Sequence, residues 1–227
     1  MKLRNKELIL FDLDGTLVDS VPDLALALND MLKSLERETF SVDIIRAWVG
    51  NGAQTLVKRG LSGSAEIDKN IEKELFEKAL AIFLKSYAKY LCVETVTYPN
   101  VVSTLQTLKD QGFRLALVTN KPFDFIKPLL DGLGMKDMFE LCLGGDSLEK
   151  KKPEPEPFLH ICKTLGVSVE KSLIVGDSKN DILAAKSAKM QSIAVTYGYN
   201  YGEDISVHNP DYVVDDFAEI LSILEKY

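Results

Sequence analysis

Near its N-terminus the chain reads Leu8-Ile-Leu-Phe-Asp12-Leu-Asp14-Gly-Thr16-Leu-Val-Asp-Ser20, an apolar run that ends in two carboxylates. Successive side chains of a strand point to opposite faces, so Asp12 and Asp14 at the strand's end are expected to point the same way. Two carboxylates held close together repel each other unless a cation or a shared proton offsets the charge, and Mg²⁺ is a hard cation suited to oxygen ligands. A strand that simply ends in a polar Asp-Gly turn is the alternative.

The length and composition are those of an ordinary globular protein. Of 227 residues, 46% are hydrophobic and 27% are charged, which is enough to build a substantial core. The net charge is −7 and no basic stripe appears, which argues against a nucleic-acid partner. No apolar stretch approaches membrane-spanning length or fits a signal peptide. Three widely separated cysteines in apolar sequence predict reduced thiols in a cytoplasmic protein, namely Cys92, Cys142 and Cys162.

Helical spacing of apolar residues dominates the part of the chain that follows the first strand. It predicts helices over residues 22–35, 42–49, 53–61 and about 67–91. Ser20, followed three residues later by Asp23, resembles a capping box at the start of the first of these helices. We therefore expect an all-helical cap domain over residues 20–95, inserted into a core domain formed by residues 1–19 and 96–227.

From residue 98 onward, predicted strands alternate with predicted helices. Strands are expected over 113–119, 139–143, 172–176, 192–196 and 212–214, with helices over 101–111 and 123–133, one ending near 165, one over 181–190, and one beginning at 217. Near-continuous apolar strands in such an alternation predict an α/β fold, in which a doubly wound parallel sheet is covered by helices on both faces.

Ligands of such a sheet bind at the carboxyl ends of its strands. Four groups of polar residues fall there: Asp12 with Asp14, Thr119 with Asn120, Lys152, and Asp177. Carboxylates without histidine or cysteine suit Mg²⁺ rather than zinc. Together with a hydroxyl and a lysine they suit phosphoryl transfer, in which a carboxylate can attack phosphorus and form an aspartyl phosphate. The helical insertion is placed to cover this edge as a lid.

In order and spacing, these groups resemble the four signature motifs of the haloacid dehalogenase (HAD) superfamily, and the similarity covers essentially the whole chain. The motifs are Asp12-Leu-Asp14-Gly-Thr16, Thr119-Asn120, Lys152-Pro153 and Gly176-Asp177-Ser-Lys-Asn-Asp181. Further segments resemble the bacterial phosphoglycolate phosphatases of this superfamily, namely Trp48-Val-Gly-Asn-Gly52, Thr119-Asn-Lys-Pro122, Lys152-Pro-Glu-Pro-Glu-Pro157 and Thr196-Tyr-Gly-Tyr-Asn-Tyr-Gly-Glu203.

The resemblance assigns roles to four carboxylates. Asp12 would be the nucleophile and a Mg²⁺ ligand. Asp14 would protonate the leaving alkoxide, then activate the hydrolytic water, while its backbone carbonyl binds the metal. Asp177 would complete the metal shell, and Asp181 would bind the metal directly or through a water. From the residue alone, an ordinary acid at a helix N-terminus, favoured there by the macrodipole, is the alternative for Asp181.

The resemblance also assigns phosphate-binding roles. Thr119 would bind the phosphoryl oxygens with Asn120 beside it, and Lys152 would neutralise charge on the nucleophile and the phosphate. The residues alone do not distinguish Lys152 from the adjacent Lys150 and Lys151. Within the lid, Asn51 lies between two glycines and is a candidate for substrate specificity, with a plain turn as the alternative. Three basic lid residues could bind a substrate carboxylate or simply face solvent: Arg46, Lys58 and Arg59.

The implied activity is Mg²⁺-dependent hydrolysis of a small phosphorylated metabolite, with 2-phosphoglycolate favoured and glycolate and phosphate as products. The alternatives are a phosphatase or phosphomutase of the same superfamily that acts on a sugar phosphate or pyrophosphate, and a phosphoacceptor signalling domain. Two further readings are disfavoured. Gly145-Asp-Ser-Leu148 spells a short esterase motif but lies far from the N-terminus, and a calcium loop at Asp12 lacks its acidic ligands. Either a monomer or a homodimer is expected.

Overall fold

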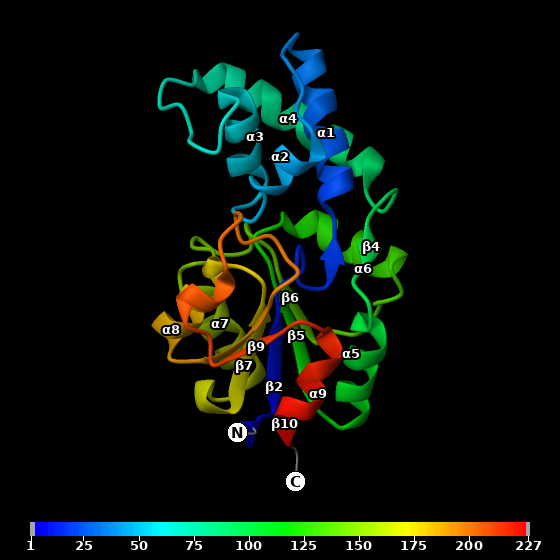
Figure 1. The fold of residues 1–227 in the computed structure, drawn as a ribbon, viewed down its shortest axis with the longest axis vertical. Coiled ribbons are helices and arrows are strands. Elements are labelled where there is room, and N and C mark those ends of the chain that lie inside the picture. The colour runs from blue at the N-terminus through cyan, green and yellow to red at the C-terminus, as the bar shows by residue number, and fades with distance from the viewer. Residues whose placement is uncertain (1–2, 226–227) are drawn as a thin grey trace.

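A six-stranded parallel sheet forms the centre of the larger part of the protein, and four helices form the smaller part above it (Figure 1). The computed structural model describes residues 3–225. In sheet order the strands are β6 (Leu141–Leu143), β5 (Arg114–Val118), β2 (Leu8–Phe11), β7 (Ser172–Gly176), β8 (Gln191–Val195) and β9 (Tyr212–Val214). The first strand of the chain thus lies inside the sheet, with later strands added on both sides. This arrangement confirms the predicted α/β fold.

Helices cover both faces of the sheet because its strands are apolar on both faces. In β2, Ile9 and Phe11 pack into one buried cluster, whereas Leu8 and Leu10 pack into another on the opposite face. The first cluster includes side chains of α5 (Val101–Asp110), α6 (Ile126–Gly132) and α9 (Ile220–Ile223). The second includes side chains of α7 (Glu156–Leu165) and α8 (Lys179–Ala188). A fully buried β2 is the expected result of helices on both faces.

The cap consists of α1 (Val21–Ser34), α2 (Val42–Arg46), α3 (Ala53–Ser62) and α4 (Lys73–Tyr90). It has an apolar cluster of its own, in which Leu28 of α1 and Phe83 of α4 are fully buried. The helix predicted from residue 67 begins only at Lys73, because the Asp68 carboxylate accepts the backbone N–H of Asn70 at 2.8 Å and holds a turn there. Within residues 3–225, no helix is both long enough and apolar enough to cross a membrane.

Short pairs of strands flank the main elements. At the junction of core and cap, β3 (Val18–Asp19) pairs antiparallel with β4 (Val96–Thr97), so the chain enters and leaves the cap side by side. The division into a cap of residues 20–95 and a core of 1–19 with 96–227 stays a proposal. At the opposite end of the core, β1 (Leu3–Arg4) pairs with β10 (Leu224–Glu225) (Figure 1). The 3-10 helices are η1 (Phe123–Phe125), η2 (Val169–Lys171), η3 (Ile205–His208) and η4 (Phe217–Glu219).

The capping box predicted at the start of α1 is wrong. The Ser20 side chain makes no capping hydrogen bond and instead donates to Asp14 Oδ1 at 2.5 Å. Asp23, completely buried, accepts the backbone N–H groups of residues 93–95 at distances of 2.8 to 3.2 Å. Both side chains therefore bind groups that are remote from the helix end, and Asp23 fixes the segment that returns from the cap to the core.

Candidate active site

The predicted polar residues gather at one edge of the sheet because three neighbouring parallel strands end there. Asp12 follows β2, Thr119 and Asn120 follow β5, and Asp177 follows β7. The sheet order β5-β2-β7 places these strand ends next to one another. Lys152 reaches the same edge from the loop that follows β6.

Three buried carboxylates form a cluster at this edge. Oxygens of Asp12, Asp177 and Asp181 lie within 4.8 Å of one another, and each side chain is buried. Burial raises the pKa of Asp12 to about 7, although the nearby Lys152 ammonium opposes this shift. Burial and the neighbouring Asp12 carboxylate also raise the pKa of Asp177 well above its ordinary value. Such a concentration of hard oxygen ligands fits a metal site, because a cation would offset the repulsion.

Lys152 is the counter-charge of this cluster. Its Nζ atom lies 2.7 Å from Asp12 Oδ1 and 2.7 Å from Asp181 Oδ1, and it donates to the backbone carbonyl of Val118 at 2.8 Å. Burial disfavours the ammonium, but the two carboxylates outweigh this cost and raise the pKa of Lys152. Lys150 is exposed, and Lys151 donates elsewhere. Of the three consecutive lysines, therefore, Lys152 is the one that contacts the acidic cluster.

Hydrogen bonds orient two of the carboxylates, Asp177 through distant parts of the chain and Asp181 through its own helix end. Thr16 Oγ1 donates to Asp177 Oδ1 at 2.8 Å, and the backbone N–H of Tyr199 donates to Asp177 Oδ2 at 2.6 Å. The Ser178 hydroxyl donates to Asp181 Oδ2 at 2.9 Å and forms with it a capping box at the start of α8. Gly15 has φ of +93°, and a Cβ there would meet the Asp177 carboxylate. The glycine of the Asp-Gly pair is thus needed for close approach.

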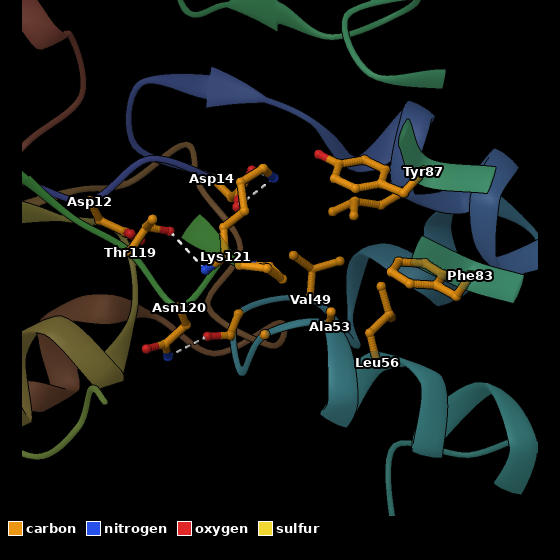
Figure 2. Close-up of a pocket in the computed structure, with 14 residues that line it drawn as sticks. Asp12, Asp14, Val49, Ala53, Leu56, Phe83, Tyr87, Thr119, Asn120 and Lys121 are labelled. Carbon is orange, nitrogen blue, oxygen red and sulfur yellow. Dashed lines mark hydrogen bonds and ion pairs between the residues drawn. The ribbon is translucent and has the colours of Figure 1, made fainter. Parts of the chain in front are cut away.

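Asp14 lies outside the three-carboxylate cluster and has a different partner. Its Oδ1 and Oδ2 atoms accept from Lys121 Nζ at 2.7 and 3.0 Å, and Figure 2 shows the two side chains facing each other. Burial disfavours the Lys121 ammonium, but Asp14 outweighs this effect and raises the pKa of Lys121. The sequence analysis missed Lys121. Its position directly after the Thr119-Asn120 strand end was the available signal.

The side chains of Thr119 and Asn120 take different positions at the end of β5. Thr119 lines a cavity that lies between the core and the cap. The Thr119 hydroxyl accepts the backbone N–H of Lys121 at 3.2 Å. Asn120 Nδ2 donates to the backbone carbonyls of Gly50 in the cap and Lys152 in the core, both at 3.1 Å. Asn120 thereby ties the cap to the core next to the acidic cluster.

The four lid residues considered for substrate binding are engaged elsewhere. Asn51 Oδ1 accepts from the Tyr201 hydroxyl at 2.9 Å. Asn51 is not among the described residues that line the cavity, and its role in specificity stays a prediction. The three basic residues also lie outside the cavity lining: Arg46 pairs with Asp19 at 3.1 Å, Arg59 donates to the carbonyl of Trp48 at 2.5 Å, and Lys58 packs over the ring of Phe76.

The cavity between the edge of the sheet and the cap has a volume of about 40 Å³ (Figure 2). One water needs at least about 10–15 Å³ of such space, so the cavity is small. Its core side is polar and its cap side largely apolar; the lining includes Asp12, Asp14, Thr119, Asn120 and Lys121 from the core, and Leu24, Val49, Leu56, Phe83 and Tyr87 from the cap. A carboxylate at the polar wall, with lysines and a hydroxyl around it, can attack a phosphoryl group held in this space.

Comparison with known proteins agrees with this geometry. Residues 9–195 match the family described as haloacid dehalogenase-like hydrolase. A phosphoglycolate phosphatase of Colwellia psychrerythraea is 54% identical over 226 residues, covering 100% of both chains, and one of Psychrobacter arcticus is 47% identical, covering 98% of this chain and 97% of the relative. The crystal structure of a predicted phosphoglycolate phosphatase from Haemophilus somnus superposes with a TM-score of 0.91 at 43% identity, covering 96% of this chain and 98% of the other. This chain therefore belongs to the haloacid dehalogenase-like hydrolase family.

Proposed function

We propose that this protein is a Mg²⁺-dependent phosphomonoesterase that hydrolyses 2-phosphoglycolate to glycolate and phosphate through an aspartyl phosphate on Asp12. The observation that carries the proposal is the buried cluster of Asp12, Asp177 and Asp181 beside Lys152, where Asp12 also lines the cavity. The choice of substrate rests on the names of the relatives, which match this chain over its full length.

Mg²⁺ fits the donor set because the cluster offers carboxylate oxygens and neither histidine nor cysteine. The carboxylates of Asp12 and Asp177 and the backbone carbonyl of Asp14 would hold it, with Asp181 acting directly or through a water. When bound, the ion supplies positive charge to the phosphoryl oxygens and to the clustered carboxylates.

Asp12 and Asp14 have different chemical roles in the proposed reaction. Asp12 attacks phosphorus in its ionised form. The Lys152 ammonium, 2.7 Å from Asp12 Oδ1, favours this form. The bond between phosphorus and the ester oxygen breaks, and the leaving alkoxide takes a proton from Asp14. Asp14 then removes a proton from water as that water attacks phosphorus, which releases phosphate and restores Asp12. Thr119 binds the phosphoryl oxygens during both steps, and Lys152 neutralises charge on Asp12 and on the phosphate.

The main alternatives are the hydrolysis of a sugar phosphate, the hydrolysis of pyrophosphate, and phosphomutase activity. A phosphoacceptor signalling domain has no need of Asp14 at the cavity or of a helical cap over the phosphorylated residue. The expectations of a cytoplasmic location and of a monomer or homodimer remain predictions.

A phosphate-release screen tests the proposal. Purified protein with Mg²⁺ is offered 2-phosphoglycolate, glucose phosphates and pyrophosphate side by side, and each reaction is repeated with EDTA. We expect kcat/KM to be at least about tenfold higher for phosphoglycolate than for the others, and phosphate release to be lost in EDTA. A preference for a glucose phosphate, isomerisation of that phosphate without release, or full activity in EDTA would contradict the proposal.

A further inference from the structure

A buried cation from the core and a buried tyrosine from the cap meet at the wall of the cavity. Lys121 comes from the core and is 4% exposed, while Tyr87 comes from α4 of the cap and is 1% exposed. Both line the cavity (Figure 2), and Lys121 Nζ lies 4.8 Å from the centre of the Tyr87 ring. The Tyr87 hydroxyl makes no hydrogen bond to any residue between 3 and 225. A buried hydroxyl without a partner is costly, so a ligand group is the expected partner.

We propose that the Lys121 ammonium and the Tyr87 hydroxyl form a subsite for the carboxylate of the substrate. This inference rests on the proposed function, since it concerns which phosphomonoester the same site selects. Both groups donate hydrogen bonds, which is what a carboxylate accepts. Because one donor belongs to the core and the other to the cap, the subsite is complete only when the cap lies over the core.

The position of Asp14 sets where this carboxylate would lie. As the proton donor, Asp14 contacts the ester oxygen of the substrate. In phosphoglycolate the carboxylate carbon is two bonds from that oxygen, roughly 2.5 Å away. Lys121 Nζ is 2.7 Å from Asp14 Oδ1, so it lies at most about 5.4 Å from an ester oxygen that is hydrogen-bonded to the same carboxyl oxygen, a gap that the carboxylate of phosphoglycolate can bridge. An ester whose leaving group lacks the carboxylate offers no hydrogen-bond acceptor to the Tyr87 hydroxyl or to the remaining donor of the Lys121 ammonium.

Other basic residues are not positioned for this role. Among the described residues that line the cavity, Lys121 is the single lysine or arginine. Lys152 is held between Asp12 and Asp181 in the acidic cluster, and Lys151 donates to the backbone carbonyl of Asn51 at 2.8 Å. An ammonium has three donors, so Lys121 can keep Asp14 and still bind a second carboxylate.

Two matched non-hydrolysable ligands test the subsite without relying on turnover. In 3-phosphonopropionate a methylene replaces the ester oxygen of phosphoglycolate, and propylphosphonate has a methyl group where the carboxylate stands. Calorimetry with Mg²⁺ gives the affinity of each ligand for the intact protein. We expect the wild type to prefer 3-phosphonopropionate by about 10- to 100-fold, the range of hydrogen bonds to a charged group.

Two substitutions then remove one donor each. Lys121→Met keeps the length of the side chain without its charge and should reduce the preference to about threefold or less. Tyr87→Phe deletes only the hydroxyl and should reduce the preference by about 3- to 10-fold. Lys151→Met is the matched control, because it removes a nearby charge from outside the cavity lining and should leave the preference unchanged.

The outcomes separate the subsite from the proposed function. A Lys121→Met protein that binds both ligands more weakly but keeps the wild-type preference would show that Lys121 only positions Asp14, and the inference would be wrong. Loss of the preference for 3-phosphonopropionate in Lys151→Met, rather than in Lys121→Met, would also overturn the inference. If Lys121→Met does not fold, the ratio of the two ligand affinities in Tyr87→Phe decides. A ratio equal to that of the wild type would show that the proposed subsite is wrong. Wild-type phosphate release from phosphoglycolate tests the proposed function by itself.

Discussion

Replacing Lys152 with methionine is expected to destabilise the metal-free protein strongly. The substitution keeps the apolar length of the side chain and removes an ammonium that contacts both Asp12 and Asp181, each at 2.7 Å. Asp181 is completely buried and Asp12 is 8% exposed, so neither carboxylate can recover its hydration. Removing one partner of such a buried ion pair costs about 3–5 kcal/mol. For a chain of this length, the loss corresponds to a melting temperature lower by roughly 6–20 °C.

The loss should depend on pH and on metal. Without Lys152, whose ammonium opposes the upward shift of the Asp12 pKa, that pKa rises further, and a native pKa above the unfolded value means that ionisation opposes folding. The destabilisation should therefore be larger at pH 8 than at pH 5, where protons relieve the repulsion. Millimolar Mg²⁺ should restore part of the loss, because it binds the native cluster and replaces some of the missing positive charge.

Thermal and urea unfolding in EDTA and in Mg²⁺, at both pH values, measure these effects. Lys150→Met is the control, since the exposed Lys150 stands two positions away and should change the free energy of unfolding by no more than about 0.5 kcal/mol. A loss below about 1 kcal/mol for Lys152→Met, equal at pH 5 and pH 8, would refute the assignment of Lys152 as the counter-charge of the cluster.

Three further predictions concern other parts of the protein. Asp14→Asn should lower kcat by about 10²- to 10⁴-fold, with the aspartyl phosphate on Asp12 visible by mass spectrometry after acid quenching; unchanged kcat would exclude proton transfer by Asp14. In the metal-free wild type, the free energy of unfolding should fall as pH rises from 5 to 8, because burial raises the pKa of Asp12 to about 7 and also raises that of Asp177. Mg²⁺ should therefore raise the melting temperature more at pH 8 than at pH 5, and an equal increase at both pH values would contradict this prediction. Asp23→Ala should lower the free energy of unfolding in urea by about 1–3 kcal/mol, because three backbone N–H groups of residues 93–95 lose their acceptor, and a neutral result would contradict that role.

Periodicity and strand ends predicted most of the architecture, because these features depend on neighbouring residues. The strand over residues 172–176 has the predicted bounds, and the rule for parallel sheets places Asp12 and Asp177 at the same edge without knowledge of the contacts between them. Helix ends were less accurate. The helix expected from residue 67 begins at Lys73 because of a turn held by the Asp68 side chain.

Several contacts that form only in the folded chain could not be predicted from local sequence. Ser20 has the sequence of a capping residue, yet its hydroxyl donates to the Asp14 carboxylate and accepts no backbone N–H of the helix. Lys152 and its two lysine neighbours are equivalent in local composition, and only burial beside Asp12 distinguishes them. Lys121 was missed because a lysine in a loop is normally solvated, whereas here the cap covers it and Asp14 compensates its charge.

Covalent catalysis requires that Asp12 attack phosphorus, and a comparison of phosphate release between two proteins measures this role. Wild type and Asp12→Asn are assayed with 2-phosphoglycolate and Mg²⁺, after circular dichroism has established that both are folded. The amide of asparagine has nearly the shape of the carboxylate but is not a nucleophile, so we predict that phosphate release by Asp12→Asn falls to the background rate. Turnover comparable to that of the wild type would contradict covalent catalysis at Asp12.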